Sequence, residues 1–273
     1  MNRAEPHAEP RCSLCGCAGP FSPFFPGASL RETRCPSCRS SRRTRDLVRA
    51  LLVSCFGPAA FHEVLEQKLA GLRGMRVYEL QAQGPLHERL ATLPEYRCSE
   101  YYPQLPSGAR HPSGVLCQNA EALSFADGSF DLVISQDVLE HMNDPFAGLA
   151  EICRVLRPGG EHLFTVPLHE GMTTRRRARD TPQGVEHILP PVRHKDPLNT
   201  EGALVYWDFG GDFTRLLAER WLQASVAVNE RLYKPDELCR IDSEAEYEAY
   251  LAARENPVAF FLYNSVVFSI RRP

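Results

Sequence analysis

The chain lacks several features that would assign it to a membrane or to a highly charged partner. None of its apolar runs is long enough to cross a bilayer, and its first residues, MNRAEPHAEP, lack the apolar core of a secretory signal peptide. Its formal net charge is only −3 over 273 residues, so total charge favours no partner. We therefore expect a cytoplasmic protein without a membrane partner, in which residues 1–10 form a disordered lead.

Two Cys-x-x-Cys pairs, CSLC and CPSC, lie near the start of the chain. Each pair bends the backbone so that two thiolates point at one ion, and the loop between the pairs lets the second complete a tetrahedron. Two disulfides are the alternative reading, but the missing secretory signal argues against them. The spacing predicts a structural zinc ion (Zn2+) bound by Cys12, Cys15, Cys35 and Cys38.

The sequence divides into three parts after the lead. Residues 11–42 are expected to form the zinc-binding module, which is too short to bury a core alone, so the metal would supply its folding free energy. Residues 43–74 carry apolar residues at helical spacing and are predicted to be a helical connector, broken at Gly57-Pro58. Residues 75–273 are expected to form the main domain.

Short apolar runs alternate with helical patterns in the main domain. The predicted strands are MRVYEL, YRCSEY, VLCQNA, FDLVIS and EHLFTVPL, with SVAVN and SVVFSI near the end. The predicted helices are GPLHERLATL, FAGLAEICRVL, which Asp144-Pro145 opens, and GDFTRLLAERW. This alternation is typical of βαβ units and predicts an α/β, Rossmann-like fold with a mostly parallel, doubly wound sheet.

Residues 169–208 interrupt this pattern. They are polar, rich in proline, histidine and arginine, and show no clear periodicity. We expect a long loop that is functional or disordered. Its length and position predict a lid, with Trp207 near its end, over the pocket for a small-molecule acceptor. Whether its histidines, among them His194, supply a base or a second metal site stays open.

Polar side chains end four of the predicted strands. In a doubly wound sheet, ligands bind beyond the carboxyl ends of the strands, where carboxylates can accept hydrogen bonds from ribose hydroxyls. The residues at these ends are Glu79, Glu100, Asn119, Glu121, Gln136 and Asp137, with Glu140 and His141 just after. The sequence therefore predicts a ligand site at this edge.

The string DGSFDLVISQDVLEH, followed by EICRVLRPGG and a strand ending in proline, resembles the class I S-adenosylmethionine-dependent methyltransferases. The resemblance covers residues 75–168 well and 200–270 loosely, and CPSCRSSRRTR is similar to a zinc module found on some bacterial members. It implies S-adenosylmethionine as cofactor and methyl transfer as reaction. By position it implies cofactor binding by Glu79, Gln81, Gly84, Glu100, Tyr101, Asn119, Ala120 and Gln136.

The chain departs from the family at the glycine-rich first motif. The segment from Glu79 to Gly84 reads ELQAQG, so Gln81 and Gln83 stand where the family has glycines that let the backbone approach the cofactor. A non-catalytic cofactor-binding protein therefore remains an alternative to the enzyme.

His141 and Asp137 are the catalytic candidates, because both follow the fourth predicted strand on the acceptor side. The structural alternatives are a place in the pocket wall for His141 and a chain turn for Asp137. An RNA methyltransferase is a further alternative, since arginines follow the second cysteine pair, although the chain lacks a strongly basic balance. The acceptor and the oligomeric state stay open.

Overall fold

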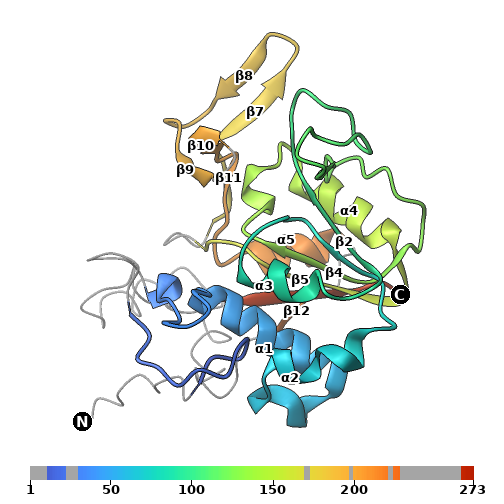
Figure 1. Ribbon diagram of the computed structural model, residues 1–273. Helices are drawn as coiled ribbons and strands as arrows, with labels where there is room; N and C mark the ends of the chain where they lie inside the picture. The colour runs from blue at the N-terminus through green and yellow to red at the C-terminus, as the bar shows by residue number, and fades with distance from the viewer. Residues whose placement is uncertain (1–10, 23–29, 169–172, 197–198, 221–223, 228–265) are drawn as a thin grey trace, which may run out of the picture.

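The computed structural model describes residues 11–22, 30–168, 173–196, 199–220, 224–227 and 266–273 (Figure 1). The expected disordered lead, residues 1–10, lies outside these residues. In the part of the chain that is described, no helix is both long and apolar enough to cross a membrane.

A seven-stranded sheet forms the centre of the molecule. Its strands, in spatial order, are β12 (Ala224–Ala227), β13 (Val267–Arg271), β5 (Leu156–Thr165), β4 (Phe130–Gln136), β1 (Val77–Glu79), β2 (Tyr96–Glu100) and β3 (Leu116–Cys117). All neighbours from β5 to β3 are parallel, and β13 is antiparallel to both β5 and β12. The predicted α/β fold with a mostly parallel sheet is confirmed.

Helices cover both faces of this sheet (Figure 1). The α-helices are α1 (Arg42–Phe56), α2 (Leu65–Lys68), α3 (Pro85–Leu90), α4 (Pro145–Val155) and α5 (Phe213–Glu219). The 3-10 turns are η1 (Leu30–Glu32), η2 (Pro58–His62), η3 (Leu69–Leu72) and η4 (Leu139–His141). Local signals set some of these starts: Asp144 accepts hydrogen bonds from the N–H groups of Phe146 and Ala147, and Pro145 occupies the first turn, as predicted.

Alternate residues of β4 point to the two faces and into two separate cores. Ile134 packs in the cluster that contains Leu47 of α1, whereas Val133 packs with Leu149 of α4. This period of two is the geometry of a strand buried on both sides, which explains why FDLVIS reads as a continuous apolar run.

The cysteine module and α1 pack directly on the sheet. One hydrophobic cluster contains Cys12 and Cys35 of the cysteine module, Leu47 of α1, and Ile134 and Val267 of the sheet. The predicted helical connector, residues 43–74, therefore includes α1 as a covering helix whose apolar face packs on the sheet.

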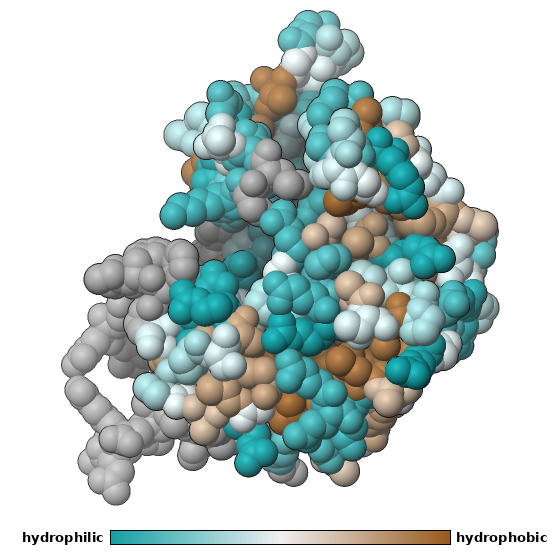
Figure 2. Space-filling view, viewed as in Figure 1, coloured by the Kyte–Doolittle hydropathy of each residue, from teal (hydrophilic) through white to brown (hydrophobic). Residues whose placement is uncertain are grey.

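Residues 173–208, which we call the insertion, form antiparallel pairs rather than an irregular loop. The strands are β6 (Arg175–Arg176), β7 (Ala178–Thr181), β8 (Gly184–His187), β9 (Arg193–Asp196), β10 (Asn199–Leu204) and β11 (Trp207–Asp208), paired as β11–β6, β7–β8 and β10–β9. The β7–β8 hairpin projects from the body, and the surface there is largely hydrophilic (Figures 1 and 2). The sequence did not predict these strands. A strand exposed on both faces has no alternation of apolar and polar residues, so no pattern in the sequence marks it.

Candidate functional site

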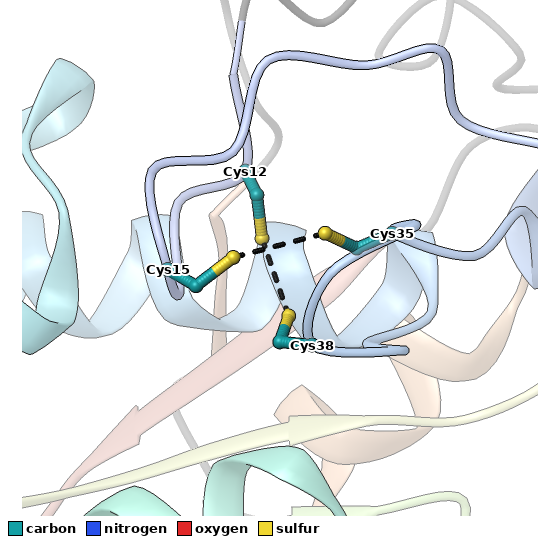
Figure 3. Close-up of side chains that lie close together, drawn as sticks. All are labelled: Cys12, Cys15, Cys35 and Cys38. Atoms are coloured by element: carbon teal, nitrogen blue, oxygen red, sulfur yellow. Dashed lines mark hydrogen bonds between the residues drawn. The ribbon is translucent and has the colours of Figure 1, made fainter.

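The four predicted zinc ligands come together in the structure. The Sγ atoms of Cys12 and Cys38 lie 3.7 Å apart, as do those of Cys15 and Cys35 (Figure 3). A disulfide needs about 2.05 Å, so these are free thiols. Four sulfurs about 2.3 Å from one tetrahedral zinc lie about 3.8 Å apart. The spacing fits a metal and excludes the disulfide alternative.

Two similar turns build this cluster. In each, the N–H group of the fifth residue donates to the carbonyl of the first cysteine: Gly16 to Cys12 at 2.8 Å and Arg39 to Cys35 at 3.0 Å. Both residues have positive φ, 78° and 63°, which glycine adopts more easily than arginine. Ser40 Oγ lies 3.1 Å from Cys38 Sγ. The two turns direct all four thiols toward one point, and the Ser40 hydroxyl lies beside the sulfur of Cys38.

Asp137 joins the N-terminal module to the carboxyl end of β4. Its carboxylate is paired with the guanidinium of Arg31 through both oxygens and lies 2.7 Å from Arg43, and Thr165 Oγ1 donates to it at 2.9 Å. Burial alone would raise the pKa of Asp137, but the charges of Arg31 and Arg43 outweigh it and hold that pKa well below its usual range.

The catalytic role predicted for Asp137 gains no support from this placement. Its oxygens are occupied by four donors, and its backbone turns the chain at a φ of 52°. Of the two readings that the sequence left open, the structure supports the turn, strengthened by an ion pair that the sequence did not predict.

A cavity of about 190 Å3 lies beyond the carboxyl ends of β1, β2 and β3, well above the roughly 10–15 Å3 that one water molecule needs. Six residues from the sequence predictions line it: Glu100, Tyr101, Asn119, Ala120, Glu121 and His141. The insertion contributes Asp180 and Tyr206 to its wall, where the Tyr206 hydroxyl donates to Asp180 at 2.8 Å. The cavity therefore lies at the sheet edge where the sequence predicts a ligand site.

Glu100 and Asn119 are held by the backbone around the cavity. The Oε1 atom of Glu100 accepts from the N–H group of Ala82 at 2.9 Å, which leaves Oε2 for a ligand. Burial is the main reason that the pKa of Glu100 is raised. Asn119 Oδ1 accepts from the N–H group of Glu121 at 2.9 Å, so its amide nitrogen is left to donate.

Four other predicted cofactor residues do not line the cavity. Gln81 Nε2 donates to the carbonyl of Gln83 at 2.9 Å, so its side chain folds back on its own loop. Gly84 has a φ of 95° and precedes α3, and Gln136 accepts from Thr44 Oγ1 at 2.9 Å. Glu79 is 1% exposed, and burial raises its pKa to about 8, so it is mostly protonated at neutral pH.

His141 lies between the cavity and the insertion. Its Nδ1 atom is 2.7 Å from the carbonyl of Leu204. A carbonyl only accepts, so Nδ1 carries a proton, and in the neutral ring the lone pair is on Nε2. That Nε2 faces Glu140 Oε1 at 3.7 Å, and His194 Nδ1 lies 3.6 Å from the same oxygen.

Sequence reasoning missed other residues of the cavity wall. Tyr78 and Leu80 come from β1 and the residue after it, Met142 and Asn143 follow η4, and Tyr206 comes from the insertion. Trp207, predicted to cover the pocket, donates from Nε1 to the carbonyl of Asn143 at 3.2 Å and so anchors the insertion. No local pattern distinguishes these residues, because they meet only through the fold.

Comparison with known proteins gives a match for the central part of the chain. Residues 95–164 match the family described as "Methyltransferase domain". The sarcosine/dimethylglycine N-methyltransferase of Halorhodospira halochloris is 38% identical over 95 residues, or 35% of this chain and 30% of that protein. The 24-methylenesterol C-methyltransferase 2 of Oryza sativa subsp. japonica is 28% identical over 194 residues, which are 65% of this chain and 47% of that protein.

The chain spans less than half the length of these two relatives. Among solved structures, an S-adenosylmethionine-dependent methyltransferase from Mesorhizobium loti has a TM-score of 0.40 at 17% identity, covering 76% of this chain and 96% of that one. Residues 95–164, which match the methyltransferase-domain family, contribute to a mostly parallel sheet with a cavity beyond its strand ends.

Proposed function

We propose that the protein transfers a methyl group from S-adenosylmethionine to a small-molecule acceptor. The observation that carries this proposal is the cavity at the carboxyl ends of the parallel strands, with the Glu100 carboxylate and the Asn119 amide in its wall. These groups fit a nucleoside: a carboxylate accepts from ribose hydroxyls and an amide hydrogen-bonds a base edge. When bound, the cofactor supplies a sulfonium methyl that is already electrophilic.

The residues of this chain would bind, orient and exclude water. Glu100 and Tyr101 lie on the ribose side, and Asn119 with Ala120 on the adenine side. The acceptor would enter from the side of His141, where the insertion contributes Tyr206. His141 lines the cavity on that side, and holding the acceptor in line with the methyl would supply most of the rate enhancement.

Several observations favour a small acceptor. The insertion contributes Asp180 and Tyr206 to the cavity wall, where the two side chains are hydrogen-bonded to each other. The printed names of similar proteins refer to small molecules, among them sarcosine, a sterol and, in a relative from Klebsiella pneumoniae 38% identical over 104 residues, ubiquinone or menaquinone. We extend this acceptor class, and no individual acceptor, to the present chain.

Four of the arginines near the cysteine cluster are buried rather than presented at the surface. Buried residues among them are Arg31, Arg42, Arg45 and Arg49, each no more than 7% exposed. Arg45 donates to the carbonyl of Ser40 at 2.6 Å, and Arg49 pairs with Asp46 at 2.8 Å. Because these arginines pair with groups inside the protein, they give little support to the alternative that the protein is an RNA methyltransferase.

We also propose that the four-cysteine cluster holds a structural zinc ion. The support is the sulfur spacing and the absence of any other role for four converging thiols. With four protein ligands the ion would have no open position, so it would stabilise the module rather than take part in the reaction.

Replacing Glu100 by alanine tests the cofactor site. Loss of a charge-assisted hydrogen bond typically costs roughly 1.5–3 kcal/mol, so the dissociation constant for S-adenosylmethionine should rise about 10- to 100-fold in calorimetric titration. Glu95→Ala is the matched control, because Glu95 is exposed just before the same strand. Equal affinity of the Glu100 variant and wild type would refute this ribose site, and wild type that binds no cofactor would refute the proposed function.

A further inference from the structure

Glu140 is a buried carboxylate whose charge needs a partner. Its exposed fraction is 0%, and neither Oε1 nor Oε2 has a hydrogen bond among the described residues. An ionised carboxylate without a hydrogen bond or a cation is strongly disfavoured in a protein interior. The charge of Arg31 acts on this carboxylate, but Arg31 is hydrogen-bonded to Asp137, so Glu140 has no hydrogen-bonded partner among the described residues.

Two imidazole rings face the same carboxylate. His141 Nε2 lies 3.7 Å and His194 Nδ1 lies 3.6 Å from Glu140 Oε1. The ring centroids are 5.1 Å apart with the planes at 89°, so the rings approach edge to face rather than stacking. The three ligand atoms lie within 4.8 Å of one another.

The orientation of His141 is that of a metal ligand. Its Nδ1–H donates to the carbonyl of Leu204, which fixes the tautomer and leaves the Nε2 lone pair on the side of Glu140. Metal-binding histidines almost always carry such a hydrogen bond on the other ring nitrogen, because it fixes the ring and raises its basicity.

We propose that Glu140, His141 and His194 bind a divalent transition metal ion, separate from the four-cysteine cluster. Ligand atoms about 2.1 Å from a tetrahedral zinc lie about 3.4 Å apart. The distances from Glu140 Oε1 to the two imidazole nitrogens, 3.7 and 3.6 Å, are slightly longer, and all three ligand atoms lie within 4.8 Å of one another. Two imidazoles with one carboxylate suit zinc and its transition-metal neighbours, whereas magnesium and calcium prefer oxygen ligands throughout.

This ion would fasten the insertion to the sheet. Glu140 and His141 belong to η4, directly after β4, and His194 belongs to β9 of the insertion. The N–H group of Tyr206 already donates to the carbonyl of Glu140 at 2.8 Å. Three protein ligands leave a position open beside the cavity that His141 lines, and that position can take an oxygen or nitrogen of the acceptor. Only this last role rests on the proposed methyl transfer.

Cobalt(II) is the probe for this site. The full-length protein is first saturated with zinc in its four-cysteine cluster and cleared of weakly bound metal, and cobalt is then titrated and followed by visible absorption. The proposal predicts one equivalent of bound cobalt with bands of nitrogen and oxygen ligation and no thiolate charge-transfer band. His194→Ala should weaken this binding about 10- to 100-fold or more, since it removes a direct ligand. His187→Ala, an exposed histidine of the same insertion, should leave it unchanged.

A proton offers the competing explanation, in which a protonated imidazole satisfies Glu140. In that case wild type binds no second metal, and Glu140→Gln is destabilised because the imidazolium loses its partner. The absence of a second metal from wild type would overturn the proposal. So would His194→Ala protein that binds cobalt as tightly as wild type. Because binding is measured without turnover, its failure leaves the proposed function standing. His194 is on a partly exposed strand, so its variant tests the site even where Glu140→Gln does not fold.

Discussion

Cys35→Ser protein is expected to lose the metal of the four-cysteine cluster and the fold of residues 11–40. Binding of structural zinc supplies about 10–16 kcal/mol in small zinc modules, far more than a core of this size. Because Cys35 and Cys12 belong to the same hydrophobic cluster as α1 and the sheet, we expect the melting temperature of the whole chain to fall as well. Metal analysis and thermal unfolding measure the two effects.

Cys17→Ser is the matched control for this prediction. Cys17 lies in the same segment, but its Sγ contacts the carbonyl of Ala18, and it is not one of the four converging cysteines. The control should keep about one zinc per chain. A Cys35→Ser protein that retains both its metal and its melting temperature would show that the cluster is not a metal site.

Asp137→Asn should destabilise the protein by about 3–5 kcal/mol, because removing one partner of a buried ion pair leaves the other charge uncompensated. The stranded charge would be Arg31, whose side chain is 8% exposed. Asp127→Asn is the control. Asp127 pairs with Arg154, but its side chain is 71% exposed, so its replacement should lower the free energy of unfolding by only about 0–1 kcal/mol. Denaturant unfolding compares the two, and equal losses would contradict the buried-pair interpretation.

The same pair predicts a pH dependence. The pKa of Asp137 is lower in the folded protein than in the unfolded chain, so the unfolded state binds more protons at acid pH. The stabilisation by Asp137 is therefore complete above the pKa that this carboxyl has in the unfolded chain, about 3.9. It is lost as the pH falls through the lower pKa that the carboxyl has in the folded protein. The difference between wild type and Asp137→Asn should be constant at neutral pH and shrink below about pH 4.

Local signals in the sequence were sufficient for the sheet and for much of the cavity. The apolar run FDLVIS predicted β4 because a strand buried on both faces must be apolar throughout. Glu100 and Asn119 were placed correctly at the cavity, because the residue after a parallel strand always lies at the same sheet edge. The four cysteines converge as predicted, since a Cys-x-x-Cys turn is a local structure.

Contacts between distant residues could not be predicted in this way. Asp137 meets Arg31 across 106 positions of the chain, and no pattern near either residue announces the pair. The strands of the insertion were missed because β8 is exposed at every position, so no alternation of apolar residues marks it. His194 was noted only as one histidine among several, since its proximity to Glu140 depends on how the insertion folds back.

The place of β13 in the sheet has a consequence for synthesis. β13 lies between β5 and β12, and its Val267 packs in the cluster that contains Cys35 and Leu47. A ribosome makes the four cysteines long before it makes Val267, so the nascent module lacks one of its packing partners until translation has passed that residue. During that interval, metal capture rather than core burial would hold residues 11–40, and zinc supply would influence how much of the newly made chain reaches its final structure.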